Sequence, residues 1–228
     1  SDLVSSLMGR SLALQDIGEY DHARSDLTHA LNLEPDNPEL HALRSEVFTV
    51  QSMFDEAERD IERARELAPS DPEYSLTHAR LLLVQGRVDE ACEAIDAAVE
   101  SGPTSMETLL LRSHLHLLEG RNEEARADAI RASNHFPDEA FAFVQLTHVQ
   151  LAQGKLNMAR KAADRAVELD PSLPDAYLVR GAAKQMSEGA EAAKEDFERA
   201  SQAPAELPMF LLGSCYDVLE ATGLERSE

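Results

Sequence analysis

The hydrophobic residues of this chain recur in blocks that predict pairs of helices. In residues 106–118 they follow the three- and four-residue spacing of one face of an α-helix, as at Leu111, Leu115 and Leu118. Gly120 then interrupts the pattern, a second helical stretch follows, and Pro137 ends it. The pattern therefore predicts a helix, a short turn and a second helix in each block.

An alanine recurs every 34 residues through almost the whole chain, and a second alanine follows each one seven residues later. A fixed period of this kind is typical of a stacked repeat protein, in which each unit packs on its neighbours. The alanines are Ala23, Ala57, Ala91, Ala125, Ala159 and Ala193, followed by Ala30, Ala64, Ala98, Ala132, Ala166 and Ala200. The six repeats predicted from them span residues 4–37, 38–71, 72–105, 106–139, 140–173 and 174–207.

Small residues mark the expected contacts between helices. When each repeat is numbered from 1 to 34, the alanines fall at positions 20 and 27, and position 8 is also small in all six repeats. Because small side chains let helix axes approach closely, we expect positions 8 and 20 to join the two helices of one repeat. We expect position 27 to meet the first helix of the next repeat. A larger side chain at these positions would overpack the contact at a cost of about 1–3 kcal/mol.

These repeats resemble the tetratricopeptide repeat family, whose unit is a 34-residue helix–turn–helix. The stretches Gly18–Ala23 and Ala166–Pro171 carry its pattern of Gly, Tyr, Ala and Pro, and the resemblance covers residues 4–207. It implies an all-α fold, a right-handed α-solenoid of antiparallel helix pairs. We expect a single domain over 1–223, with a capping helix at about 208–222 and a short tail at 224–228.

Arginine at position 7 and aspartate at position 23 occur together in repeats one, two, four and six, and both are missing from repeats three and five. Joint variation of two positions is a hint that their side chains touch. We therefore predict ion pairs between the two helices of each of these repeats. Chance agreement among six repeats is the alternative. The residues are Arg10, Asp26, Arg44, Asp60, Arg112, Asp128, Arg180 and Asp196.

The resemblance also implies a concave surface that binds peptide segments, lined by positions 2, 5, 9, 12 and 13 of the first helices. In the middle repeats positions 5, 12 and 13 are mostly apolar, position 9 holds Arg and His, and position 2 is acidic in four repeats. We predict an apolar floor with a central Arg/His ladder and an acidic rim, whose histidines make binding depend on pH near about 6–7. Packing between helices is the alternative role for any single floor residue. The predicted groove residues are Leu76, Arg80, Leu83, Leu110, His114, Leu117, Phe141, Val144, His148 and Leu151.

Composition narrows the choice of partner. The net charge is −22, which opposes binding to nucleic acid or to an anionic membrane, because such binding needs a basic surface. The charge is compatible with a peptide or protein partner with basic flanks, and a solvated acidic face that keeps the protein soluble is the preferred explanation for it. Self-association is a further expectation, because an open end of a solenoid can dock a second copy.

The sequence predicts no catalytic, cofactor-binding or metal-binding residues. It has no phosphate-binding glycine loop, no nucleophile elbow and no zinc-protease motif. We therefore expect a non-enzymatic interaction scaffold. The alternative is a regulatory or substrate-recognition region of a larger enzyme or assembly, which the start at Ser1 leaves open.

The two cysteines and the lack of a long apolar run or signal peptide favour a cytoplasmic protein without membrane insertion.

Overall fold

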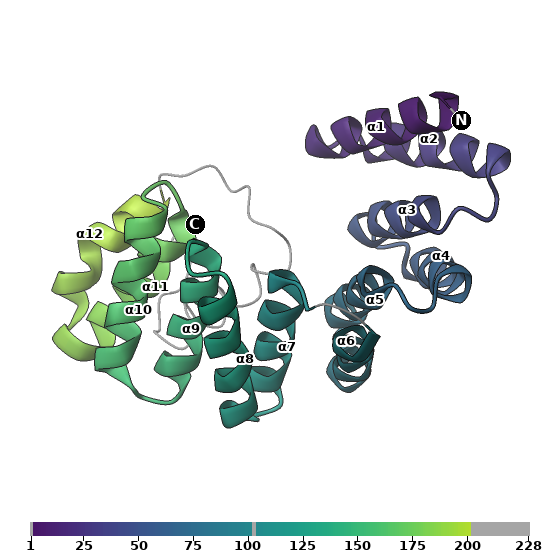
Figure 1. The fold of residues 1–228 in the computed structure, drawn as a ribbon. Helices are drawn as coiled ribbons and strands as arrows, with labels where there is room; N and C mark the ends of the chain where they lie inside the picture. Colours follow the sequence, from purple (N-terminus) through teal and green to yellow (C-terminus); the bar gives the residue numbers. More distant parts are fainter. Residues whose placement is uncertain (1, 102–103, 202–228) are drawn as a thin grey trace. The chain divides into compact units, whose positions relative to one another are not determined.

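The computed structural model describes residues 2–101 and 104–201, and these form helices and turns with no strand (Figure 1). The helices alternate between the first and second helix of a repeat, which we call helices A and B. Helices A are α1 (Asp2–Asp16), α3 (Pro38–Val50), α5 (Pro72–Val84), α7 (Met106–Leu118), α9 (Ala140–Ala152) and α11 (Pro174–Glu188). Helices B are α2 (Tyr20–Leu33), α4 (Phe54–Leu67), α6 (Val88–Ser101), α8 (Asn122–His135), α10 (Leu156–Leu169) and α12 (Ala190–Ser201).

The predicted fold class, an all-α solenoid of helix pairs, is confirmed. Within a repeat, helix A packs on helix B, as α1 does on α2, and helices α2, α4, α8 and α10 each pack on helix A of the next repeat. By the density of contacts between residues, the chain divides into two compact units, Ser1–Thr104 and Ser105–Glu228. The first unit contains α1–α6 and the second contains α7–α12. That these units form one continuous domain stays a prediction, and the expected capping helix at 208–222 lies outside the described residues.

Local sequence sets the ends of the helices. Asn37, Asp71 and Ser105 precede helices A, and their side-chain oxygens accept hydrogen bonds from the first free backbone N–H groups. The turns between A and B require a residue with positive φ. Glycine fills this place in four repeats, with φ from 67° at Gly154 to 78° at Gly18, while Ser52 adopts φ 58° in repeat two.

The repeated alanines lie in the packed interior. Alanines at positions 20 and 27 are at most 1% exposed in repeats one to five, as expected for contacts between helix axes. At position 8, the hydroxyls of Ser45 and Ser113 each donate to the backbone oxygen of the position-20 alanine on helix B, at 2.8 Å. Position 8 in repeat six is Gly181, where an added Cβ would lie 2.6 Å from the Phe197 ring. These contacts hold helices A and B close together.

Candidate functional site

The predicted floor of the groove is largely buried. Leu76, Leu110 and Val144, all at position 5, are 1%, 2% and 0% exposed. Val144 packs in one apolar cluster with Ala176 and Val179 of the next helix A. These three leucine and valine side chains therefore fill space between helices and offer no apolar surface to a partner, which is a correction to their predicted role as an accessible floor.

Two of the three predicted groove residues at position 12, and Phe141, lie nearer the surface. Leu83, Leu117 and Phe141 are half-buried, whereas Leu151 is buried in a cluster with Ala182 and Ala183. Three of the predicted groove residues (Leu76, Arg80 and Leu83) belong to the first unit, and the other seven belong to the second.

His148 in the predicted Arg/His ladder does not carry the expected positive charge. Arg80 is half-buried, and His114 and His148 are 6% and 4% exposed. Burial lowers the pKa of His148 to about 3, with a further lowering from the neighbouring His114. His148 is therefore neutral near pH 7, contributes no positive charge, and does not titrate near pH 6–7 as expected. Neither of its ring nitrogens has a hydrogen-bond partner among the described residues.

Among the groove positions, position 13 brings apolar side chains to the surface in several repeats. Val50 and Val84 are 38% and 46% exposed in the first unit, and Leu118 and Met186 are 43% and 49% exposed in the second. All but Met186 are the last residue of a helix A. Helices α3 and α5 pack against each other, as do α7 with α9 and α9 with α11. Equivalent residues on adjacent parallel helices form a row, so each unit carries one, which we call the position-13 row: Val50 and Val84 in the first unit, and Leu118, the exposed Ala152 and Met186 in the second.

Sequence reasoning placed position 13 among the groove positions but did not select its residues as the site. The signal was present, because Val50, Val84, Leu118, Ala152 and Met186 recur at the repeat period. The sequence does not show how deeply each position is buried, because burial depends on how closely the A helices pack.

The acidic rim is exposed in three of four repeats. Glu39, Glu73 and Glu107 at position 2 are exposed, whereas Asp175 is only 1% exposed. The position-2 residues lie in the first turn of each helix A, where a carboxylate also interacts favourably with the helix dipole. Exposed acidic side chains thus lie at one end of these helices and the position-13 row at the other.

The four arginines at position 7 each meet the aspartate at position 23 of the same repeat. In every pair Nε donates to one carboxylate oxygen and Nη2 to the other, with distances from 2.5 to 3.0 Å. The carboxylates are nearly buried, since the side chain of Asp26 is 10% exposed and that of Asp196 only 2%. These bidentate pairs bridge helices A and B.

A second basic group approaches three of the four carboxylates. His41 Nδ1 lies 2.9 Å from Asp60, His116 Nε2 lies 3.7 Å from Asp128, and Lys184 Nζ lies 2.7 Å from Asp196. The Arg180 and Lys184 hydrogen bonds lower the pKa of Asp196 despite the opposing effect of burial. A buried carboxylate is thus matched by basic groups, as burial of a charge requires.

Repeats three and five replace the ion pair in two different ways. In repeat three, His78 Nδ1 lies 2.9 Å from Nη1 of Arg65, a side chain of the preceding helix B. Burial and the charge of Arg65 lower the pKa of His78 to about 4, so the ring is neutral and accepts this hydrogen bond. In repeat five the positions hold the apolar residues Leu146 and Ala162.

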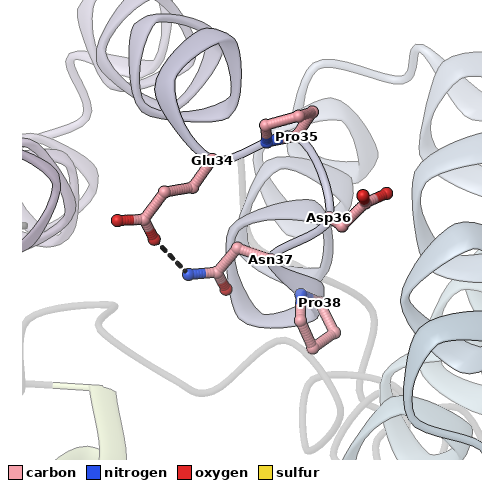
Figure 2. Close-up of a pocket in the computed structure, with 5 residues that line it drawn as sticks. All are labelled: Glu34, Pro35, Asp36, Asn37 and Pro38. Atoms are coloured by element: carbon pink, nitrogen blue, oxygen red, sulfur yellow. Dashed lines mark hydrogen bonds between the residues drawn. The ribbon is translucent and has the colours of Figure 1, made fainter.

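A shallow pocket lies at the loop between α2 and α3, lined by Glu34, Pro35, Asp36, Asn37 and Pro38 (Figure 2). Its polar groups already have structural roles. Asn37 Nδ2 donates to Glu34 at 3.0 Å, Asn37 Oδ1 accepts from the first turn of α3, and Asp36 pairs with Arg63 at 2.7 Å. The described residues contain no cluster of three ligands suited to a metal ion. The pocket is therefore a poor candidate for a functional site.

The described helices include none that is both long and apolar enough to cross a membrane.

Comparison with solved structures shows the same fold in several repeat proteins. PilW, a type IV pilus biogenesis factor, is 20% identical, with a TM-score of 0.75 over 93% of this chain and 98% of its own. A tetratricopeptide repeat protein from Thermus thermophilus is 18% identical, with a TM-score of 0.68 over 79% of this chain and 98% of its own. YrrB, described as having an unusual peptide-binding site, is 18% identical, with a TM-score of 0.57 over 82% of this chain and 96% of its own.

No curated protein sequence matches this one significantly. The sequence profile of the tetratricopeptide repeat family matches residues 8–72 and 76–138, which together make up more than half of the chain. The chain therefore belongs to the tetratricopeptide repeat family.

Proposed function

We propose that this protein is a non-catalytic scaffold that binds a peptide or a partner helix along its A helices, at the position-13 row. The observation that carries the proposal is the exposure of apolar side chains at position 13 within each unit, Val50 and Val84 in the first and Leu118 and Met186 in the second. A recurrent apolar row differs from scattered surface leucines, because contiguous exposed apolar surface is typical of sites that bind partners.

The half-buried residues Leu83 and Leu117 directly precede the row residues Val84 and Leu118 and extend the apolar area, whereas Phe141 at position 2 lies at the other end of its helix. The buried members of the predicted groove (Leu76, Leu110, Val144, His148 and Leu151) set the spacing of the A helices and so the shape of the surface. The bound segment would place apolar side chains on the row. Adjacent A helices lie about 8–10 Å apart, which matches seven residues of a helix or three of an extended chain.

Charge supports a partner with basic flanks. The chain carries a net charge of −22, and Glu39, Glu73 and Glu107 are exposed on helices A. The position-13 row lies at the C-terminal ends of these helices, where the helix dipole favours cations by about 0.3–1 kcal/mol. Lysine or arginine residues beside the apolar anchors would therefore strengthen binding, and more so at low salt.

A peptide ligand is also consistent with the fold shared with YrrB, whose peptide-binding site was described as unusual. At 18% identity this similarity extends to the fold and not to the ligand. Recognition of a short segment in a groove of helices is a common mode of peptide binding.

The experiment begins by selecting peptides from a random peptide library on the full chain and measuring the best one by fluorescence anisotropy. Met186→Ser removes a row residue, and Met158→Ser removes a methionine of nearly equal exposure (47% against 49%) from helix B α10. The proposal predicts at least a tenfold loss of affinity for Met186→Ser and less than a twofold change for Met158→Ser. Equal effects of the two substitutions, or selected peptides that ignore both, would refute it.

A further inference from the structure

The first ion pair of the chain differs from the other three in its exposure. The Arg10 side chain is 64% exposed, whereas those of Arg44, Arg112 and Arg180 are 20%, 17% and 20% exposed. All four make the same bidentate contact with their aspartates. The difference in exposure therefore comes from what covers the edge of the guanidinium that faces away from the aspartate. Arg10 Nη1 has no hydrogen bond or ion pair among the described residues, and it lies on an uncovered face of α1.

The preceding helix B covers this face in repeats two and six. Arg44 Nη1 donates to Thr28 Oγ1 at 3.3 Å, and Arg180 Nη1 lies 3.8 Å from Asp164 Oδ1. Thr28 and Asp164 both occupy position 25 of the repeat before the arginine. A position-25 oxygen that meets a position-7 arginine is therefore a recurrent contact between consecutive repeats.

The last described helix has an uncovered face of the matching kind. Alanines at position 27 are at most 1% exposed in repeats one to five, but Ala200 on α12 is only half-buried. Position 25 of α12 is Glu198, and its side chain is exposed. Among the described residues, no helix covers the face of α12 that other helices B turn toward the next helix A, and this face carries a carboxylate at the position that meets arginine elsewhere.

The contact between α10 and α11 is a template for joining the two open faces. On α10, Arg160 and Asp164 occupy positions 21 and 25, and α12 has Lys194 and Glu198 at the same positions. On α11, small residues flank Arg180 at positions 3 and 10, namely Ala176 and Ala183, both 0% exposed. The corresponding residues of α1 are Ser6 and Ala13, which flank Arg10 and are exposed. The residues of α12 and α1 therefore match those of α10 and α11 in charge and size at each of these positions.

We propose that the protein associates head to tail, with α12 of one copy packed on α1 of the next as α10 packs on α11. Glu198 pairs with Arg10 of the neighbouring copy, and Ser6 and Ala13 allow close approach of the helices. Because the two faces differ, the contact is heterologous and leaves a free face at each end, so association continues beyond a dimer. The proposal concerns a surface other than the position-13 row and does not depend on peptide binding.

The test measures the weight-average mass of the full chain by sedimentation equilibrium over a range of concentrations. Glu198→Arg places like charges at the contact, and Ala13→Arg inserts a long charged side chain on the α1 face. Both residues are exposed within the chain, so the fold should tolerate these changes. Glu195→Arg alters the charge of α12 equally at an exposed position outside the proposed contact and is the matched control.

We expect the mass of the wild type and of Glu195→Arg to rise with concentration and that of each contact variant to stay at one chain. A mixture of Glu198→Arg with Ala13→Arg retains one intact face from each partner, so it should form a complex of two chains and no larger. Two outcomes would overturn the proposal: a wild-type chain that stays monomeric, as when α12 is covered by another segment, or a mixture that does not associate.

Discussion

Arg112 on α7 and Asp128 on α8 are joined by two parallel hydrogen bonds, Nε to Oδ2 and Nη2 to Oδ1, both 2.7 Å long. The two side chains are 17% and 7% exposed, so this pair is largely removed from water. The equivalent residues of repeat five are Leu146 and Ala162. The same place in the repeat thus accepts either a charged pair or an apolar pair.

Removal of one partner should therefore cost more than removal of both. We expect Asp128→Ala to lower the free energy of unfolding by about 3 kcal/mol, because the Arg112 guanidinium loses its carboxylate in a largely buried place. The double variant Arg112→Leu with Asp128→Ala, which copies repeat five, should regain most of this loss. Urea unfolding followed by circular dichroism measures both. A double variant as unstable as the single one would contradict the prediction.

The same reasoning predicts a difference between repeats one and four. Arg10 is 64% exposed, so water already solvates much of its guanidinium, whereas Arg112 is 17% exposed. We expect Asp26→Ala to destabilise the fold less than Asp128→Ala, because the Arg10 guanidinium that loses its partner stays solvated whereas Arg112 does not. Thermal unfolding of the two variants gives the ranking. Equal losses would show that exposure does not control the contribution of these pairs.

Gly181 and Gly9 provide a matched test of packing between helices A and B. A Cβ at Gly181 would lie 2.6 Å from Cε1 of Phe197, while a Cβ at Gly9 would meet nothing within 4 Å. Gly181→Ala should therefore destabilise the protein by about 1–3 kcal/mol through overpacking. Gly9→Ala should stabilise it by about 0.5–1 kcal/mol, since glycine is a poor residue inside a helix. If Phe197→Leu fails to restore any stability to Gly181→Ala, the clash is not the cause.

Ser52 occupies a turn position at which the other repeats tolerate positive φ through glycine. Its φ of 58° lies in the left-handed region, which disfavours residues with a Cβ by about 1–2 kcal/mol. Ser52→Gly should therefore raise the free energy of unfolding by up to about 1 kcal/mol. The reverse change at Gly120, whose φ is 73°, should lower it. Urea unfolding measures both changes. A lower free energy of unfolding for Ser52→Gly, or a higher one for Gly120→Ser, would contradict this assignment of the turn.

The buried His148 makes stability depend on pH. Its pKa is lowered to about 3 in the folded protein, whereas in the unfolded chain it has its ordinary value near 6.5. Between these values the unfolded chain binds a proton that the folded chain does not, so the free energy of unfolding falls as pH decreases. The slope from one such group is at most about 1.4 kcal/mol per pH unit.

Unfolding by urea between about pH 7 and about pH 5 measures this slope. His148→Leu should reduce the slope and leave the part that comes from His78, whose pKa is also lowered, to about 4. His29→Leu, at an exposed position, should leave the slope unchanged. A slope that the loss of His148 does not reduce would show that the ring does not remain neutral on folding.

The repeat register could be predicted because size is encoded directly in residue type. Only small residues fit where helix axes approach closely, so a column such as Ala23 and Ala57 reveals the packing contacts. Positions 7 and 23 vary together for a similar reason, since an arginine such as Arg44 needs a carboxylate such as Asp60 beside it.

Which of the expected groove positions are buried and which are exposed could not be predicted in this way. Leucine and valine occupy both position 5, where Val144 is 0% exposed, and position 13, where Val84 is 46% exposed. Which of them reaches water depends on the packing between consecutive A helices, a tertiary property that residue type does not encode. The partner of His78 was missed because Arg65 comes from position 28 of the previous repeat, where no column of arginines exists.

Methionine methyl NMR tests the central claim most directly, because Met186 lies in the position-13 row and Met158 lies on helix B α10 at nearly the same exposure. The measurement records ¹³C-methyl spectra of the full chain as the selected peptide is added. We expect the Met186 signal to shift in proportion to the fraction of protein bound while the Met158 signal stays in place. A shift of Met158 with Met186 unchanged would contradict the proposal that the A-helix surface is the binding site.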